Sequence, residues 1–290
     1  QIVINPINND SYIELNESQF IKLVKGINIF TVNNTVYNNI KLYGFENTYT
    51  VSKWGTYKMN NSKINVLYCS DAKYYVGLFA SLYSLIKSSS YTGHTHFNFF
   101  IPIEYNSYFS NLLYLFETKY GFELSKTVVY IDENILDPVL LSTKCYNGGG
   151  HLLNIANLSR LLIGEFFEYD KLIYLDCDSI IQLDILEKIN FLSMKYGIYA
   201  SLANIQNRSP KKTIIIKMEN ILDCNYDWNS LIGHKIDPNK FVLMGAPFVA
   251  DCKKWGDIYK NILKIVNAHN KAKNGIYKLF TMSLQNLLFY

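Results

Sequence analysis

The sequence predicts an α/β protein with a mostly parallel central sheet flanked by helices. From residue 63 onward, short continuous apolar runs alternate with segments whose apolar residues recur at helical spacing. Strands that are apolar along their whole length are buried on both faces, as in a parallel sheet covered by helices. The 290 residues are 49% hydrophobic and 18% charged, so the chain can build a sizeable core.

Each expected element follows from its local pattern. Apolar runs predict strands at 64–70, 96–103, 127–131 and 171–175, with further strands at 196–203 and 240–250. Helical spacing predicts helices at 74–87, 107–120, 153–167, 254–269 and 280–290. Residues 1–62 contain short β-branched and aromatic segments separated by asparagines, which predicts a small strand-rich N-terminal appendage. Residues 63–290 would then form the main domain.

Composition narrows the range of partners. A net charge of +4 suits an anionic small molecule and is too small to indicate nucleic acid binding. The five cysteines are scattered without CxxC spacing, so we expect free thiols, a cytoplasmic-type environment and no zinc site. No apolar run reaches the roughly 20 residues that span a bilayer, so no membrane span is expected.

One stretch, KLIYLDCDSIIQLD at 171–184, carries chemistry. Asp176 and Asp178 follow the fourth strand at positions i and i+2, and an extended backbone would place both on one face with Cys177 pointing away. Carboxylate oxygens suit Mg²⁺ or Mn²⁺, which would neutralise charge on a departing nucleoside diphosphate. The plainer alternative is a turn after a strand, where aspartate is common. Ligands of such sheets bind beyond the carboxyl ends of the strands, where Asp71 and Asp132 also lie.

Three blocks of the chain resemble glycosyltransferase family 8, retaining enzymes with the GT-A fold that include glycogenin and bacterial galactosyltransferases. The blocks are INVLYCSDAKYYVGLFASLYSLI at 64–86, NLSRLLIGEFF at 157–167 leading into YDKLIYLDCDSIIQLD at 169–184, and FVADCKKW at 248–255. The resemblance implies a GT-A fold and metal-dependent transfer of a hexose from a UDP-sugar to a hydroxyl acceptor with retention. It also implies Mn²⁺ or Mg²⁺ as cofactor; the acceptor, a glycan or a protein, stays open.

The first block implies the nucleoside pocket. By resemblance, Cys69, Ser70 and Asp71 would line the uracil and ribose pocket, and Tyr74 would lie against the base. Each has a plainer alternative: Tyr74 could be a core aromatic residue, and Asp71 could only cap the following helix.

The second block implies the diphosphate and metal groups. By resemblance, Arg160 would reach the donor through its sugar or diphosphate, Asp176 would contact ribose and metal, and Asp178 would be a direct metal ligand. The alternative for Arg160 is a solvated charge on an amphipathic helix.

The sugar side departs from the family pattern. Asn204 stands where the family has an acidic residue, and 244–246 reads Met-Gly-Ala in place of Asn-Ala-Gly. The family's Asp-Gln-Asp segment aligns with 281–283 or, in another register, places its Gln-Asp pair on 285–286. The family's third metal ligand, a histidine in a Gly-Lys-Pro-Trp motif, has no counterpart; of the five histidines, His151, directly after the Gly148–Gly150 break, is the one to watch.

These departures leave alternatives open. The chain can be truncated at its C-terminal end, the donor can carry a different sugar, or the domain can bind a nucleotide sugar without turnover. We favour truncation together with an altered pocket. A haloacid-dehalogenase-type phosphatase also uses D-x-D at a strand end, with the first Asp as nucleophile, but carries it on the first core strand with Thr or Val where Ile180 stands.

Overall fold

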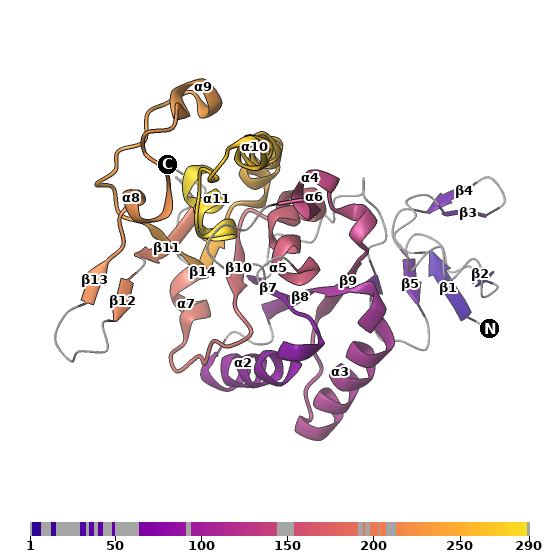
Figure 1. The fold of residues 1–290 in the computed structure, drawn as a ribbon. Coiled ribbons are helices and arrows are strands. Elements are labelled where there is room, and N and C mark those ends of the chain that lie inside the picture. The colour runs from indigo at the N-terminus through magenta and orange to yellow at the C-terminus, as the bar shows by residue number, and fades with distance from the viewer. Residues whose placement is uncertain are drawn as a thin grey trace.

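The computed structural model describes residues 64–90, 94–143, 154–190, 194, 198–202, 204–206 and 213–288, together with short strands between residues 2 and 49. Its centre is a twisted sheet with strand order β11-β14-β10-β7-β8-β9 (Figure 1). The bounds of these strands are β7 Ile64–Cys69, β8 Thr95–Pro102, β9 Lys126–Ile131, β10 Leu172–Leu175, β11 Ile198–Leu202 and β14 Leu243–Ala250. The predicted α/β fold with a mostly parallel sheet is confirmed.

The four middle strands run parallel, and their register aligns their carboxyl ends. β10 pairs with β7 up to Leu175 opposite Tyr68, and β7 pairs with β8 up to Cys69 opposite Phe100. β14 is antiparallel to both β10 and β11. Every residue of β8, β9 and β10 is buried, which explains why these strands read as continuous apolar runs.

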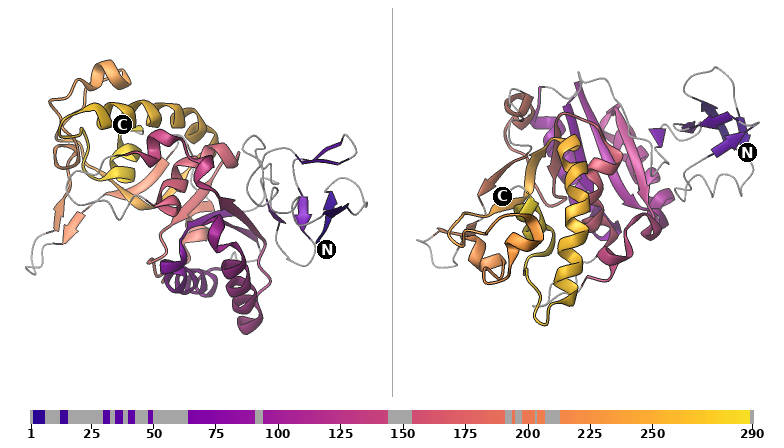
Figure 2. Two further views of the ribbon diagram at one scale, coloured as in Figure 1. Left: turned by 45° about the vertical axis from the view of Figure 1, so that its right-hand side comes forward. Right: turned by 90° about the horizontal axis from the view of Figure 1, so that it is seen from above.

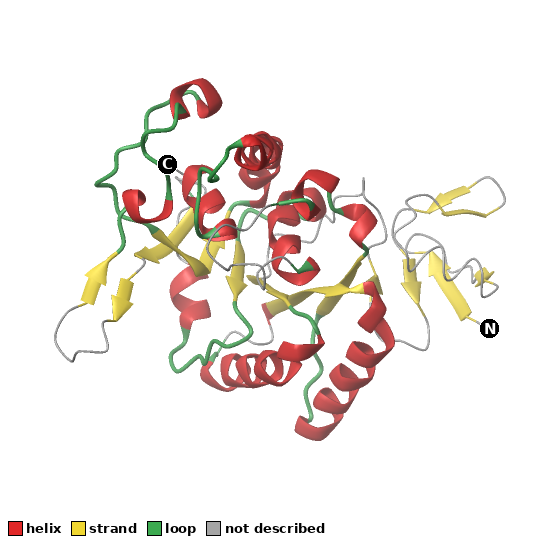
Figure 3. Cartoon of the chain, viewed as in Figure 1, coloured by secondary structure: helices red, strands yellow, loops and turns green. Residues whose placement is uncertain are grey.

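Helices cover both faces of the sheet. One face packs against α2 Tyr75–Ser88, α3 Asn106–Tyr120 and α7 Ile185–Asn190 in one hydrophobic cluster. The other packs against α5 Ile155–Ser159, α6 Ile163–Phe166, α10 Cys252–Lys271 and α11 Phe280–Leu288 in a second cluster. Figure 3 shows the strands lying between these two layers of helices. Side chains alternate between the clusters along each strand, as the two-residue period requires.

Local signals set several helix ends. α3 ends at Gly121, whose φ of +66° gives the left-handed conformation that glycine adopts at little cost. α10 begins after Asp251, whose carboxylate accepts hydrogen bonds from the backbone N–H groups of Lys253 and Lys254. The turns of 3₁₀ helix are η1 Ala72–Tyr74, η3 Ile103–Tyr105, η4 Glu133–Ile135 and η6 Arg160–Leu162.

The prediction of one continuous helix over 153–167 is wrong in its detail. The segment consists of α5, the 3₁₀ turn η6 and α6. Several short elements carry no sequence pattern that predicts them: α4 Pro138–Leu141, α7, α8 Met218–Ile221, α9 Trp228–Ile232, and the hairpin of β12 Asn204–Gln206 with β13 Thr213–Ile215. These are too short to show a period, so tertiary contacts decide them.

The N-terminal region contributes short strands. Their bounds are β1 Ile2–Pro6, β2 Ile13–Leu15, β3 Phe30–Val32, β4 Thr35–Tyr37, β5 Ile40–Leu42 and β6 Thr48–Tyr49. β6 pairs in parallel with β9, and β5, β1 and β2 follow in the same sheet (Figure 2). The division into two domains at residue 62 stays a prediction.

Candidate functional site

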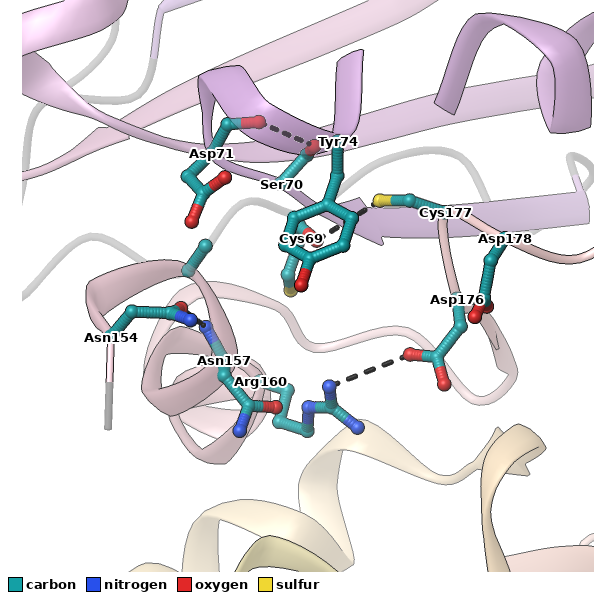
Figure 4. Close-up of a pocket in the computed structure, with 11 residues that line it drawn as sticks. Cys69, Ser70, Asp71, Tyr74, Asn154, Asn157, Arg160, Asp176, Cys177 and Asp178 are labelled. Carbon is teal, nitrogen blue, oxygen red and sulfur yellow. Dashed lines mark hydrogen bonds and ion pairs between the residues drawn. The ribbon is translucent and has the colours of Figure 1, made fainter. Parts of the chain in front are cut away.

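A pocket lies beyond the carboxyl ends of β7 and β10, where the sheet topology favours ligand binding. It opens to solvent and has a cavity volume of about 200 Å³. Its lining includes every residue that the sequence analysis singled out for donor or metal binding: Cys69, Ser70, Asp71, Tyr74, Arg160, Asp176 and Asp178. Figure 4 shows these side chains arranged around one hollow.

A turn, not an extended strand, presents the two carboxylates. β10 ends at Leu175, and the Ser179 N–H donates to the Asp176 carbonyl at 3.1 Å. The expectation of an extended backbone through Asp178 is therefore wrong. The turn nevertheless places both carboxylates on one side, while Cys177 points the other way (Figure 4). The Cys177 thiol donates to the Cys69 carbonyl at 3.3 Å, which joins this turn to the end of β7.

The two thiols beside the pocket are uncharged at neutral pH. Burial raises the pKa of Cys69 and of Cys177 to about 12. Cys69, Cys177, Cys224 and Cys252 are free, as predicted, and Cys145 lies outside the described residues. Neither pocket thiol is therefore suited to bind a cation, because the thiolate is the ligand form.

Helix α2 and the residues just after it hold the carboxylate turn and the loop that follows it. The Ile181 N–H donates to the Ser84 hydroxyl at 2.9 Å. Asp184 accepts from the Ser90 N–H at 2.8 Å and from the Ser90 hydroxyl at 2.6 Å. Burial acts to raise the pKa of Asp184, but these hydrogen bonds outweigh it and lower the pKa to about 2. Asp184 thus anchors the loop and does not line the pocket.

Arg160 is buried against the pocket wall. Its side chain is 13% exposed, its guanidinium lies 4.6 Å from the centre of the Tyr174 ring, and it donates to Asp176 Oδ1 at 3.4 Å and to the Gly245 carbonyl at 3.4 Å. Nε of Arg160 is buried and has no hydrogen-bond partner among the described residues. The solvated-charge alternative is wrong for this arginine.

The end of β7 supplies the opposite wall. Ser70 is buried, and its hydroxyl donates to the Asp71 carbonyl at 3.1 Å. One carboxylate oxygen of Asp71 also accepts from the Lys73 N–H at 3.0 Å. Asp71 therefore caps the following helical turn, as the alternative expected, and lines the pocket as well. Tyr74 is 53% exposed and lines the pocket, so it is not the core aromatic residue of the alternative reading.

Sequence reasoning missed two polar lining residues, Asn154 and Asn157, and the apolar Ala156 between them. The Asn154 side chain caps α5 by accepting from the Asn157 N–H at 2.7 Å. Asn157 precedes Arg160 by three positions, so helical spacing could have placed both on one face. A second pocket adjoins the first across Asp71, Asn154 and Ala156 and continues over the ends of β8 and β9.

The donor set fits a hard divalent cation. Tyr174 and Arg160 both contact Oδ1 of Asp176, whereas Oδ2 and both oxygens of Asp178 have no protein partner among the described residues. In the part of the chain that the structure describes, no third His, Cys, Asp or Glu completes a metal cluster. Mg²⁺ and Mn²⁺ sites commonly use one or two carboxylates with substrate phosphates and water, so two aspartates suffice.

The side-chain amides of Gln285 and Asn286 in α11 form hydrogen bonds with backbone groups. Asn286 accepts from the Leu243 N–H at 2.7 Å and donates to the carbonyls of Leu243 at 2.9 Å and Met282 at 2.8 Å. Gln285 donates to the Met244 carbonyl at 3.2 Å. These hydrogen bonds fasten α11 to β14 and occupy both amide hydrogens of Asn286.

The histidines give no third metal ligand in the described region. His96 is bonded to Ser125 and Thr127, His269 accepts backbone N–H groups at Nδ1, and neither these nor His94 and His234 line the pocket. His151 and Gly148–Gly150 lie outside the described residues.

None of the helices in the described part combines the length and apolar character needed to cross a bilayer.

Comparison with solved structures indicates the fold. The bifunctional glycosyltransferase WbbM is similar over 84% of this chain and 40% of its own, with 15% identity and a TM-score of 0.50. The galactosyltransferase LgtC matches over 78% and 70%, with 15% identity and a TM-score of 0.49. Mouse xyloside xylosyltransferase 1 matches over 78% and 81%, with 14% identity and a TM-score of 0.47. Of these three, WbbM alone reaches 0.50, and this chain spans less than half of the WbbM chain.

Comparison with protein families identifies the chain. No curated protein matches the sequence. One family model, described as glycosyl transferase family 8, matches residues 65–290, which covers the second and third blocks of the predicted resemblance and all but the first residue of the first block. The GT-A fold expected from that resemblance agrees with the sheet order and with the WbbM likeness. Because the match extends over well more than half of its length, the chain belongs to glycosyl transferase family 8.

Proposed function

We propose that this chain transfers a hexose from a UDP-sugar to a hydroxyl acceptor with retention of anomeric configuration, using Mn²⁺ or Mg²⁺. The observation that supports it best is the convergence of the Asp176–Asp178 turn, the buried Arg160 and the end of β7 on one pocket. That pocket combines carboxylates for a cation with a fixed positive charge for an anion. Family membership supports sugar transfer as the reaction class.

The pocket divides into two chemical halves. On the β7 side, Ser70, Asp71 and the backbone at Cys69 offer polar groups for a ribose and a base, and the exposed ring of Tyr74 offers a face for stacking. The adjoining pocket beyond Asp71 enlarges the space on this side. On the β10 side, Asp176 and Asp178 would hold the cation, whose chemistry is to neutralise charge on the diphosphate leaving group.

Arg160 would act on the same charge from the protein. Burial in a region of low dielectric strengthens the attraction between a fixed cation and a developing anion. Burial alone would lower the pKa of Arg160, but neighbouring Tyr174 and Asp176 raise it above its ordinary value, so the guanidinium stays charged. We nominate no protein nucleophile, because electrostatic stabilisation of the leaving diphosphate can carry the reaction.

Calorimetric titration of UDP with and without Mn²⁺ tests the binding half of the proposal. We expect wild-type protein to bind UDP only when Mn²⁺ is present, and Asp178→Ala to lose this metal-dependent binding. Asp132→Ala is the matched control, because Asp132 follows strand β9 of the same sheet and caps η4 without lining either pocket. Equal UDP binding by wild type and Asp178→Ala would refute the assignment.

Turnover separates the remaining alternatives. Full-length protein incubated with UDP-sugars should release UDP and free sugar, with Asp178→Ala inactive. The engagement of Gln285 and Asn286 by backbone groups favours, as second candidate, a domain that binds the donor without turnover. Metal-dependent UDP binding without UDP release would support that candidate. The phosphatase alternative has no support from the family match, and only a phosphoenzyme trapped on Asp176 would revive it.

A further inference from the structure

Three aromatic side chains form a continuous stack behind the pocket. Tyr174 of β10 and Phe248 of β14 are register partners, with ring centroids 4.8 Å apart and an interplanar angle of 17°. Phe248 stacks in turn on Trp255 of α10, with centroids 5.3 Å apart at 8°. All three rings are almost fully buried. We call Tyr174, Phe248 and Trp255 the aromatic stack.

The pocket end of the aromatic stack touches both charged groups of the site. The Tyr174 hydroxyl donates to Asp176 Oδ1 at 3.0 Å, and the face of the same ring lies 4.6 Å from the Arg160 guanidinium. The face of an aromatic ring attracts a cation, and this attraction is stronger when both groups are buried. The Tyr174 ring therefore helps to hold the Arg160 guanidinium over its face.

The far end of the aromatic stack holds the backbone beside Arg160. Trp255 Nε1 donates to the Leu161 carbonyl at 3.1 Å, in a buried contact. Leu161 directly follows Arg160 in the 3₁₀ turn η6. The arginine is therefore supported twice, at its guanidinium by the Tyr174 ring and at its backbone by Trp255.

Arg160 has few other restraints. Its contacts with Asp176 and the Gly245 carbonyl are both 3.4 Å, which is long for charge-assisted hydrogen bonds, and its buried Nε has no partner among the described residues. The position of the guanidinium thus depends chiefly on the ring beneath it and on the turn that carries it.

We infer that the aromatic stack is a positioning device that sets Arg160 opposite Asp176 and leaves Oδ2 of Asp176 for a ligand. Tyr174, Phe248 and Trp255 are positioning residues: they act through Arg160 and Asp176 and do not touch the donor themselves. The inference rests on the proposed function and explains why the FVADCKKW segment at 248–255 matters to a site whose pocket it does not line.

The test compares UDP affinity, with saturating Mn²⁺, across paired variants. Tyr174→Phe removes the hydrogen bond to Asp176 and keeps the ring, and should weaken UDP binding about tenfold. Tyr174→Leu also removes the ring and should weaken it further. Tyr68→Phe is the control, because it removes another buried tyrosine hydroxyl, bonded to Ser81 on the opposite face of the sheet, and should leave UDP affinity unchanged.

A second pair tests the far end of the aromatic stack. Trp255→Phe keeps a ring but removes the N–H that holds Leu161, and should weaken UDP binding about fivefold. Trp228→Phe removes a comparable donor, which bonds the Asp223 carbonyl at 2.7 Å away from the pocket, and should have no effect. In a double-mutant cycle, Tyr174→Leu should weaken UDP binding hardly more than Tyr174→Phe does once Arg160→Lys is present, because the ring, unlike the hydroxyl, acts through the arginine.

The outcomes are distinguishable from those of the proposed function. Variants that lose thermal stability but keep wild-type UDP affinity, or a fully additive cycle, would overturn the inference. If wild type binds no UDP, the proposed function fails, but the inference can still be tested by nuclear magnetic resonance of the Arg160 Nε–H group. Its resonance is assigned by its loss in Arg160→Lys. The Nε hydrogen should exchange with solvent slowly in wild type and in Trp228→Phe, and quickly in Trp255→Phe and Tyr174→Leu. Equal exchange in all four would overturn the inference.

Discussion

Replacing Gly77 by alanine should disturb the carboxylate turn without any contact with a ligand. Gly77 lies in α2, and a Cβ at this position would be 2.7 Å from the Cys177 carbonyl oxygen. Cys177 is the middle residue between Asp176 and Asp178. The absence of a side chain at residue 77 therefore permits the helix to approach the turn that presents both carboxylates.

The required displacement can be worked from this distance. Restoring an ordinary contact of 3.4 Å needs 3.4 − 2.7 = 0.7 Å of movement, and the contact is with backbone, which has no rotamer to change. A site constellation tolerates about 0.5 Å, so we expect UDP affinity in Mn²⁺ to fall about tenfold or more. Overpacking costs about 1–3 kcal/mol, and the better helix propensity of alanine offsets about 1 kcal/mol of it.

The assay pairs urea unfolding with calorimetric titration of UDP and Mn²⁺. Ala80→Gly is the matched control: Ala80 is exposed on the same helix, and the change costs about 1 kcal/mol of helix propensity without approaching the turn. We expect Ala80→Gly to keep wild-type UDP affinity despite lower stability. A folded Gly77→Ala protein with wild-type affinity would show that the turn does not depend on this close approach.

Three further predictions concern the scaffold. Glu117→Gln leaves Lys126, only 5% exposed and paired at 2.7 Å, without its counter-charge, and should lower the free energy of unfolding by about 3 kcal/mol in urea titration. Asp184→Asn should make the stability of the protein less sensitive to acid. The pKa of Asp184 is about 2 in the folded protein, below its unfolded value of about 3.9. The stability contributed by the Ser90 hydrogen bonds is therefore present at neutral pH and is lost as the pH falls from about 4 through 2. Unfolding midpoints of wild type and variant should therefore converge in that window. Asn286→Asp places a carboxylate against two backbone carbonyls and should destabilise by about 1–3 kcal/mol, whereas an unchanged melting temperature would contradict the observed amide bonds.

The parallel half of the fold could be predicted because its strands are buried on both faces. Continuous apolar runs at β7, β8, β9 and β10 follow directly from that burial, and the amphipathic pattern of α2 and α3 follows from packing on one side. The antiparallel pairing of β14 could not be derived, since strand direction depends on a long connection through α8 and α9 that carries no periodic signal.

The residues that line the pocket were predictable, and their geometry was not. Strand ends and the family blocks singled out Asp71, Arg160 and Asp176, and all three line one pocket, while their roles stay a prediction. The turn at Asp176 stood in the sequence only as the plainer alternative to an extended backbone, because its geometry depends on the close approach of α2 at Gly77 to the Cys177 carbonyl. The burial of Arg160 likewise depends on Tyr174, whose apolar ring reads in sequence as one more core residue.

Electron paramagnetic resonance of Mn²⁺ tests most directly whether the Asp176–Asp178 turn holds a cation for a pyrophosphate. Protein and UDP together should remove the free Mn²⁺ signal at about one ion per chain, and Asp178→Asn, which keeps the size of the side chain, should leave most of that signal in place. Equal loss of the free signal with wild type and Asp178→Asn would contradict the account, as would no loss with wild type at all.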